Sequence, residues 1–240
     1  MSKDVIVLAV HGMGDTSPAF ASELQSKLSS RLRGDWNRIH FDSIYYQGVF
    51  QDNEERVMRE MRRVDLDSIR LRRFVLYGFS DAAGLEREAG KPNRPYQKVQ
   101  EIIRRTLKTA YESAGGSKPV VLIAQSLGCH VMSNYLWDAQ KRGPRRGVWK
   151  APTTRRGTHL DNFLRLKSLR YFYTTGCNIP IFVAGFPERR IRAVTTQGDG
   201  YDFSWQNFYD QDDVLGWPLR PLSASYRAAV TEDREINAGG

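Results

Sequence analysis

One serine in the sequence has the neighbours that a nucleophilic serine requires. Ser126 lies within residues 124–128 (AQSLG), after the apolar run VVLI and before a stretch with helical spacing. The pattern G-x-S-x-G holds a serine in a strained turn, and the flanking residues must be small because a strand and a helix crowd that turn. Here alanine replaces the first glycine. The context predicts that Ser126 is a nucleophile; the alternative is a serine that caps an ordinary helix.

A second segment, HGMGD at residues 11–15, follows the first apolar run and places glycines where backbone can approach a ligand. In serine hydrolases with this kind of turn, an N–H from such a loop and the N–H after the nucleophile bind the oxyanion of the tetrahedral intermediate. Met13 and Leu127 are the predicted donors, and we expect His11, Gly12 and Gln125 to line the substrate site. The alternative is a phosphate-binding turn, but neither G-x-G-x-x-G nor G-x-x-x-x-G-K-[ST] is present.

Three aspartates follow a later predicted strand: Asp210, Asp212 and Asp213. An acid in this place can orient a histidine and stabilise its protonated form, and the chain order of serine then acid fits. Asp213 is the first candidate, Asp212 the second and Asp210 the third. At least one or two of them must be turn residues without a catalytic role.

Taken in order, these segments resemble the α/β-hydrolase superfamily, particularly its lipase and esterase-like members, over nearly the whole chain. The resemblance is carried by VIVLAVHGMG, VVLIAQSLGCH, TTGCNIP and NFYDQDDVLGWPL. It implies a hydrolase of a small-molecule or lipid ester or thioester that works through an acyl-enzyme, with no metal or organic cofactor. It also implies that Asn178 and Pro180 lie near the site. The substrate itself stays open.

The histidine of such a site is the missing part. In the superfamily it follows the acid, whereas all four histidines here precede Asp213: His11, His40, His130 and His159. His130 is one helical turn after Ser126 and should point away from the site, and His159 could reach it only if its own segment folded over it. We therefore expect the natural polypeptide to continue beyond Gly240 and to carry the histidine there. The alternative is a non-catalytic hydrolase-like binding protein.

The elements that must position these residues alternate along the chain. Short apolar runs predict strands at 5–10, 39–46, 118–125, 169–175 and 203–208, and periodic stretches predict helices at 17–33, 52–63, 66–80, 96–114 and 127–141. A last helix and strand are expected within 222–237. Ser17 before Pro18 predicts the start of the first helix. This alternation predicts the α/β-hydrolase fold, a mostly parallel twisted sheet flanked by helices on both faces, with ligands at the carboxyl ends of the strands.

Composition narrows the class of protein. The chain has 240 residues, 40% of them hydrophobic and 26% charged, which suits one soluble domain over 1–240. No apolar run reaches the 18 or so residues of a membrane span, and the N-terminus lacks the features of an export signal. We expect a cytoplasmic protein in which Cys129 and Cys177 are reduced.

The net charge of +9 is concentrated in one segment, because residues 141–170 hold ten basic residues and one acid, Asp161. Within it, 142–158 lacks periodicity and is predicted to be a basic loop or lid-like insertion. One interpretation is a solvated loop; another is a surface that contacts anionic lipid or an acidic partner. No recognisable nucleic-acid-binding module accompanies it.

Overall fold

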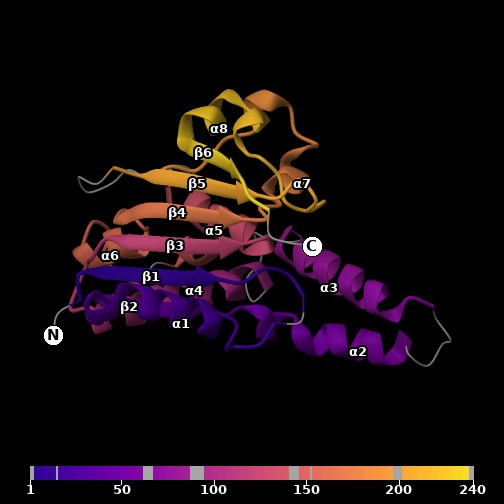
Figure 1. The fold of residues 1–240 in the computed structure, drawn as a ribbon, viewed down its shortest axis with the longest axis horizontal. Helices are drawn as coiled ribbons and strands as arrows, with labels where there is room; N and C mark the ends of the chain where they lie inside the picture. The colour runs from indigo at the N-terminus through magenta and orange to yellow at the C-terminus, as the bar shows by residue number, and fades with distance from the viewer. Residues whose placement is uncertain are drawn as a thin grey trace.

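The computed structural model describes residues 3–14, 16–61, 67–86, 95–140, 146–151, 153–196 and 202–237. Within these residues the chain forms a six-stranded sheet in the order β2-β1-β3-β4-β5-β6, and all five strand pairs are parallel. The strands are β1 (Val5–Val10), β2 (Ile39–Ile44), β3 (Val120–Gln125), β4 (Leu169–Thr175), β5 (Ser204–Tyr209) and β6 (Val230–Glu235). Their carboxyl ends meet at one edge of the sheet, on the right in Figure 1.

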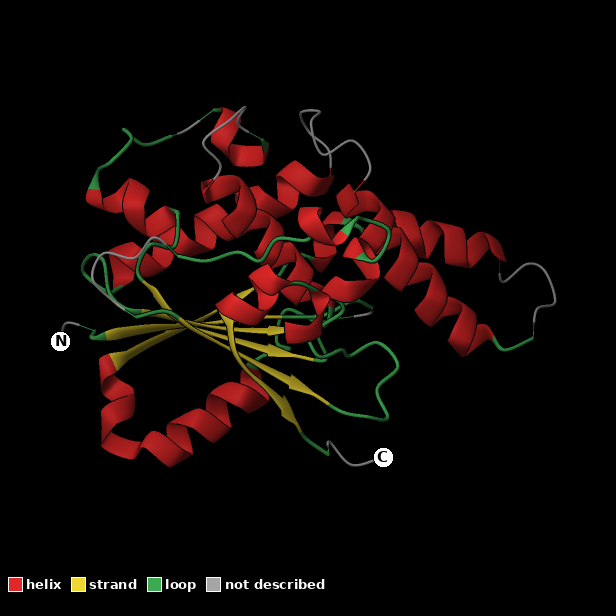
Figure 2. Ribbon diagram, turned by 90° about the horizontal axis from the view of Figure 1, so that it is seen from above, coloured by secondary structure: helices red, strands yellow, loops and turns green. Residues whose placement is uncertain are grey.

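Helices lie on both faces of this sheet. One face carries α1 (Ser22–Leu32), and the other carries α4 (Pro95–Ser113), α5 (Leu127–Gln140) and α6 (His159–Leu164) (Figure 2). Two short helices, α7 (Ile179–Val183) and α8 (Ala224–Ala229), follow β4 and β5. A pair of helices, α2 (Gln51–Met61) and α3 (Ile69–Glu86), projects from the body at the carboxyl edge (Figure 1). The predicted fold class is confirmed.

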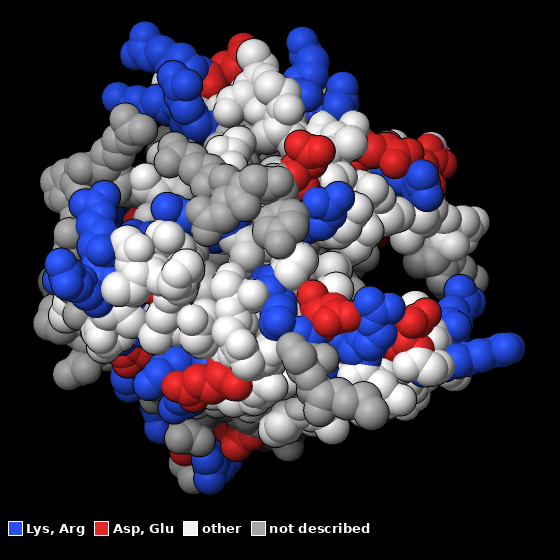
Figure 3. All heavy atoms as spheres, turned by 90° about the vertical axis from the view of Figure 1, so that its left-hand side faces the viewer, with Lys and Arg blue, Asp and Glu red and all other residues white. Residues whose placement is uncertain are grey.

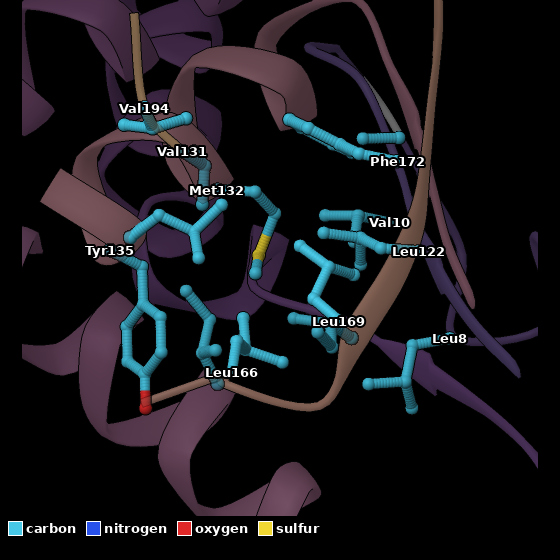
Figure 4. Close-up of a cluster of buried hydrophobic side chains, with 14 of the residues drawn as sticks. Leu8, Val10, Leu122, Val131, Met132, Tyr135, Leu166, Leu169, Phe172 and Val194 are labelled. Atoms are coloured by element: carbon cyan, nitrogen blue, oxygen red, sulfur yellow. The ribbon is translucent and has the colours of Figure 1, made fainter. Parts of the chain in front are cut away.

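The buried core lies between the sheet and α5. Leu8, Leu122 and Phe172 stand opposite one another on three neighbouring strands, and each is 0% exposed. Met132 of α5 points toward them (Figure 4). Full burial of a side chain of this size stabilises a fold by about 1.5–3 kcal/mol. This contact therefore fixes α5, and with it the turn that precedes α5.

The first helix begins later than predicted. It starts at Ser22, and its N-cap is Ala21, which makes no side-chain hydrogen bond. The predicted cap at Ser17 is wrong. The Phe20 ring, just before the helix, meets the His11 ring edge-on at 5.1 Å between centroids. We attribute the delayed start to this contact, which holds residues 18–20 in a turn. The other predicted elements agree with the structure to within a few residues at their ends, except that the helix predicted at 66–80 continues to Glu86.

The described part of the basic segment is anchored to the helices on the face of the sheet that carries α4, α5 and α6. Val148 and Trp149 are each 2% exposed, and the Val148 N–H donates to Gln100 Oε1 of α4 at 3.0 Å. The Arg165 guanidinium lies over the Trp149 ring at 4.3 Å and forms an ion pair with Asp161 at 3.0 Å. Residues 141–145 and 152 lie outside the described part of the chain.

This segment lies near the amino ends of the strands. In Figure 1, α6 is at the edge opposite the carboxyl ends, so the described part of the segment does not cover Ser126. On the face seen in Figure 3, basic groups form separate clusters with acidic groups between them. Contact of this segment with an anionic surface stays a prediction.

Among the described helices, none has the length and apolar character needed to cross a membrane.

Candidate active site

Ser126 occupies a strained turn between β3 and α5. Its φ of +48° lies in the left-handed region, which residues other than glycine rarely adopt. The Ser126 N–H donates to the Thr175 carbonyl at the end of β4 at 2.9 Å, and the Cys129 N–H donates to the Ser126 carbonyl at 3.0 Å. These bonds connect the turn to β4 and α5 and hold the serine in this conformation.

Small residues around Ser126 make the turn possible. A Cβ atom on Gly12 would lie 2.9 Å from Ser126 Cβ, and one on Gly128 would lie 2.4 Å from the His11 carbonyl oxygen. Ala124 is fully buried below the turn. The close approach of the 11–14 loop to the start of α5 therefore explains the small residues of both sequence motifs.

Gly128→Ala is expected to destabilise the protein, because the added methyl group would meet backbone atoms that cannot rotate away. Overpacking of this kind costs about 1–3 kcal/mol, and we expect the upper part of that range. Urea denaturation should show a lower midpoint than for Gly34→Ala, where the Cβ would meet nothing within 4 Å. Equal midpoints for the two variants would contradict the described packing.

His11 fixes the backbone of the 11–14 loop. Its Nδ1 lies 2.7 Å from the Gly12 carbonyl, and its Nε2 accepts the Tyr46 N–H at 3.0 Å. These bonds assign the neutral ring with its proton on Nδ1. The sequence places His11 in the loop expected to bind the oxyanion and among the residues of the substrate site. In the structure it shapes that loop, because its side chain is 2% exposed and both nitrogens are bound to backbone groups.

Tyr46 is a second anchor of this loop, and no sequence motif predicts it. Its ring stacks on the His11 ring at 4.0 Å, and its hydroxyl donates to the His11 carbonyl at 3.1 Å. Tyr46 follows β2, the strand that pairs with β1. The loop expected to bind the oxyanion is therefore held from the neighbouring strand.

Burial of His11 predicts a loss of stability in mild acid. Removal of water from the ring lowers the pKa of His11 from 6.5 to about 4, although the hydrogen bond to Gly12 opposes this change. The unfolded chain binds this proton below pH 6.5 and the folded chain only below about pH 4. The free energy of unfolding should therefore fall by about 3 kcal/mol as the pH is lowered through this window, and His11 should cause no pH dependence above it.

Denaturation of the wild type and of His11→Gln across this pH range checks the prediction. The variant should be less stable at neutral pH but should show a shallower dependence on pH. His159→Gln, which changes an exposed histidine, should keep the slope of the wild type. If His11→Gln keeps that slope too, His11 does not cause it.

Asp213 lies against the strand end that binds the Ser126 turn. Its Oδ2 is 3.0 Å from the position of a Cβ on Gly176, the residue after Thr175. Its Oδ1 accepts the Leu215 N–H at 2.9 Å. Asp212 is exposed, and its N–H donates to Asp210 Oδ1 at 3.0 Å, so these two residues form the turn.

Glycines leave room for the Asp213 carboxylate. A Cβ on Gly216 would lie 2.6 Å from Asp213 Oδ2, and Gly176 has a φ of +52°. The glycine of the TTGCNIP segment is thus a sequence signal for the position of the acid.

A partly buried network holds the loop that carries Asp213. Asn207 donates through Nδ2 to the Trp217 carbonyl at 3.0 Å and to Asp233 Oδ1 at 2.8 Å. Asp233, on β6, also accepts the N–H groups of Leu219 and Arg220 at 2.9 and 2.7 Å. Sequence reasoning missed this pair, since its members are 26 residues apart.

The remaining predicted residues surround the same edge of the sheet. Leu127 is the first residue of α5, so its N–H has no acceptor within the helix. Met13 packs against Gly78 of α3. Gln125 is exposed at the end of β3. Asn178 is 1% exposed, and its side-chain nitrogen and oxygen have no hydrogen-bond partner among the described residues.

The other histidines have different surroundings. His130 stacks on Phe182 at 3.8 Å and lies 3.0 Å from Asn134 Nδ2, whereas His40 is on β2 and His159 begins α6. Within the described part of the chain, no hydrogen bond joins a histidine ring to Ser126. Nor do three or more His, Cys, Asp or Glu residues gather there in a group that could hold a metal ion.

No protein-family model matches the chain, and no curated protein matches its sequence. Solved structures do resemble it. A lipase/esterase from Lactobacillus plantarum has 12% identity and a TM-score of 0.48, with 100% of this chain and 78% of that chain covered. The carboxylesterase Cest-2923 from the same species has 11% identity and a TM-score of 0.44, with 100% and 72% covered.

A third structure, from Xanthomonas campestris, is described as a hydrolase of the alpha/beta superfamily. It has 12% identity and a TM-score of 0.41, with 99% of this chain and 88% of that chain covered. Because these identities and TM-scores are low, the function proposed below rests on the residues of this chain.

Proposed function

We propose that the chain is a single-domain, cytoplasmic serine hydrolase that cleaves a carboxylic ester or thioester through an acyl-enzyme. The observation that carries this proposal is Ser126 itself, held at a φ of +48° between a parallel strand and a helix at the carboxyl edge. Ligand sites of open α/β sheets lie at this edge. The neighbouring Gly12 and the Asp213 carboxylate beside Gly176 support it further.

In the proposed reaction, Ser126 Oγ attacks the carbonyl carbon and transfers its proton to a base. The N–H groups of Met13 and Leu127 bind the oxyanion of the tetrahedral intermediate. That intermediate collapses to the acyl-enzyme as the alcohol or thiol leaves with the proton. Water then attacks the acyl carbon, and the acid product leaves Ser126 free again. Asp213 orients the base and stabilises its protonated form.

The base in this proposal is a histidine outside residues 1–240. Both ring nitrogens of His11 are bound to backbone groups, and His130 stacks on Phe182. Neither ring is therefore placed to accept the Ser126 proton. The intact mass of the natural protein and its gene sequence test this part: a protein that ends at Gly240 would overturn it.

An active-site fluorophosphonate tests the nucleophile. In the natural full-length protein it should add one phosphonyl group, located on the peptide that contains Ser126 by mass spectrometry. Urea-unfolded protein should not react, because reactivity depends on the assembled site. Labelling of another residue, or no labelling of folded protein, would contradict the mechanism.

A non-catalytic binding protein is the second candidate, favoured by the surroundings of His11 and His130. Loss of the base leaves ligand binding possible while turnover falls by several orders of magnitude. Ester turnover that depends on Ser126 would exclude this candidate. Ligand binding without any turnover by the natural full-length protein would support it.

A further inference from the structure

A cavity separate from the Ser126 turn is lined by residues of α5, α7, α8 and 186–192. Figure 1 shows α7 and α8 in the upper part of the molecule. Its volume is about 200 Å³. The α5 residues that line it begin at His130, one turn beyond Ser126, and continue to Trp137. The cavity therefore extends along α5 away from the carboxyl edge, and the proposed hydrolysis makes no use of it.

The inner wall of this cavity is apolar and packed. Ile179 and Tyr226 line it and are 1% and 2% exposed. Phe182 is stacked on the His130 ring with an angle of 12° between the ring planes. Side chains held in this way lose little freedom when a ligand enters, so the inner wall is preformed.

The mouth of the cavity exposes aromatic side chains. Trp137 is 41% exposed and Phe186 is 53% exposed, and both line the cavity. Large, solvent-exposed apolar side chains around a concave site are typical of binding surfaces. Their flat faces favour a planar, apolar ligand.

Two guanidinium groups give this mouth a positive charge. Arg190 and Arg192 line the cavity, and both are exposed. Among the described residues, no carboxylate forms an ion pair with either. Arginine binds a carboxylate through two parallel hydrogen bonds, and it also stacks on aromatic rings.

We propose that this cavity binds a small aromatic carboxylate. The ring system enters between Phe182 and Trp137, and the carboxylate stays at the mouth with Arg190 and Arg192. The volume lies below the range of about 300–1,000 Å³ that is usual for drug-sized ligands, which limits the body to one or two rings. The site is independent of the proposed chemistry at Ser126.

The probe for this proposal is 2-naphthoate, with the neutral 2-naphthamide as its matched control. Both are titrated into the Ser126→Ala protein, so that the result does not depend on hydrolysis. Proton–nitrogen NMR spectra follow the indole signal that disappears in Trp137→Phe. This signal should shift saturably with naphthoate, while the Trp36 signal should not move. Naphthamide should bind about tenfold more weakly, because it lacks the charge.

Three variants locate the binding. The double variant Arg190→Gln/Arg192→Gln should raise the Kd for naphthoate about fivefold to tenfold, whereas Arg189→Gln, an exposed neighbour outside the cavity lining, should leave it unchanged. Val183→Phe should abolish binding by filling the cavity without a change of charge. Circular dichroism and thermal unfolding verify that each variant is folded.

The proposal is overturned by any of three results. The first is that the Trp137 signal shows no saturable shift at 10 mM naphthoate, which is about the weakest Kd expected for a ligand of this size. The second is that the Arg189 variant and the Arg190/Arg192 variant change the Kd equally. The third is that folded Val183→Phe binds naphthoate as the wild type does. None of these results bears on labelling of Ser126, so failure here is distinct from failure of the hydrolase proposal.

Discussion

Ser126→Ala is expected to reduce ester turnover by the natural full-length protein by about 10⁴-fold or more, because the variant lacks the atom that forms the acyl-enzyme. The fold should survive, since the Ser126 N–H and carbonyl, which bind Thr175 and Cys129, are unchanged. The measurement is kcat/KM for a p-nitrophenyl ester and for a matched thioester.

The matched control is Ser30→Ala, which changes an exposed serine on α1. It should keep full activity. If Ser126→Ala keeps more than a tenth of the wild-type activity, hydrolysis occurs elsewhere and Ser126 is not the nucleophile. A thermal unfolding curve for each protein separates loss of activity from loss of structure.

Asp213→Asn should lower kcat/KM by about 10³- to 10⁴-fold. An amide can still accept the Leu215 N–H through its oxygen, so the turn is retained. The negative charge that would hold the histidine in the correct tautomer and stabilise its protonated form is lost. The same esters are used, and the effect should appear mainly in kcat because the charge acts in the transition state.

Asp212→Asn provides the comparison, since Asp212 is one residue away and exposed. Its activity should stay within about twofold of the wild type, which is the range usual for a surface change. A larger loss for Asp212→Asn than for Asp213→Asn would transfer the role of the acid to Asp212. Equal activity of both variants and the wild type would exclude an aspartate of this loop.

The sheet was predictable because its strands are marked by local patterns. The apolar runs at 5–10 and 120–124 are long enough for a strand and too short for a helix, and the second residue after each is small, Gly12 and Ser126. The turn at Ser126 follows from the same patterns, since a strand, a small-residue turn and a helix lie in consecutive residues. The start of α1 was not predictable, because the Phe20 ring contacts His11 across a loop.

The parts of the site that sequence reasoning missed depend on long-range partners. Tyr46, just after β2, anchors His11 from 35 residues away, and Asn207 on β5 binds Asp233 on the neighbouring strand β6. Nothing near either residue in the sequence marks it as a partner. The position of the basic segment at the amino edge of the sheet was also not predictable, because it depends on burial of Trp149 against Tyr135 and Arg165.

The Asn207–Asp233 bond also sets an order of assembly. Ser126 comes into place once β1, β3 and β4 are paired, but the Asp213 loop gains its supporting carboxylate only when β6 docks on β5. During synthesis the N-terminal residues emerge first, so β1, β3 and β4 are available for pairing before β6 has been made. A chain emerging from the ribosome could therefore form its serine turn before β6 supports the Asp213 loop, and the two parts of the candidate site would come together only when the last described strand joined the sheet.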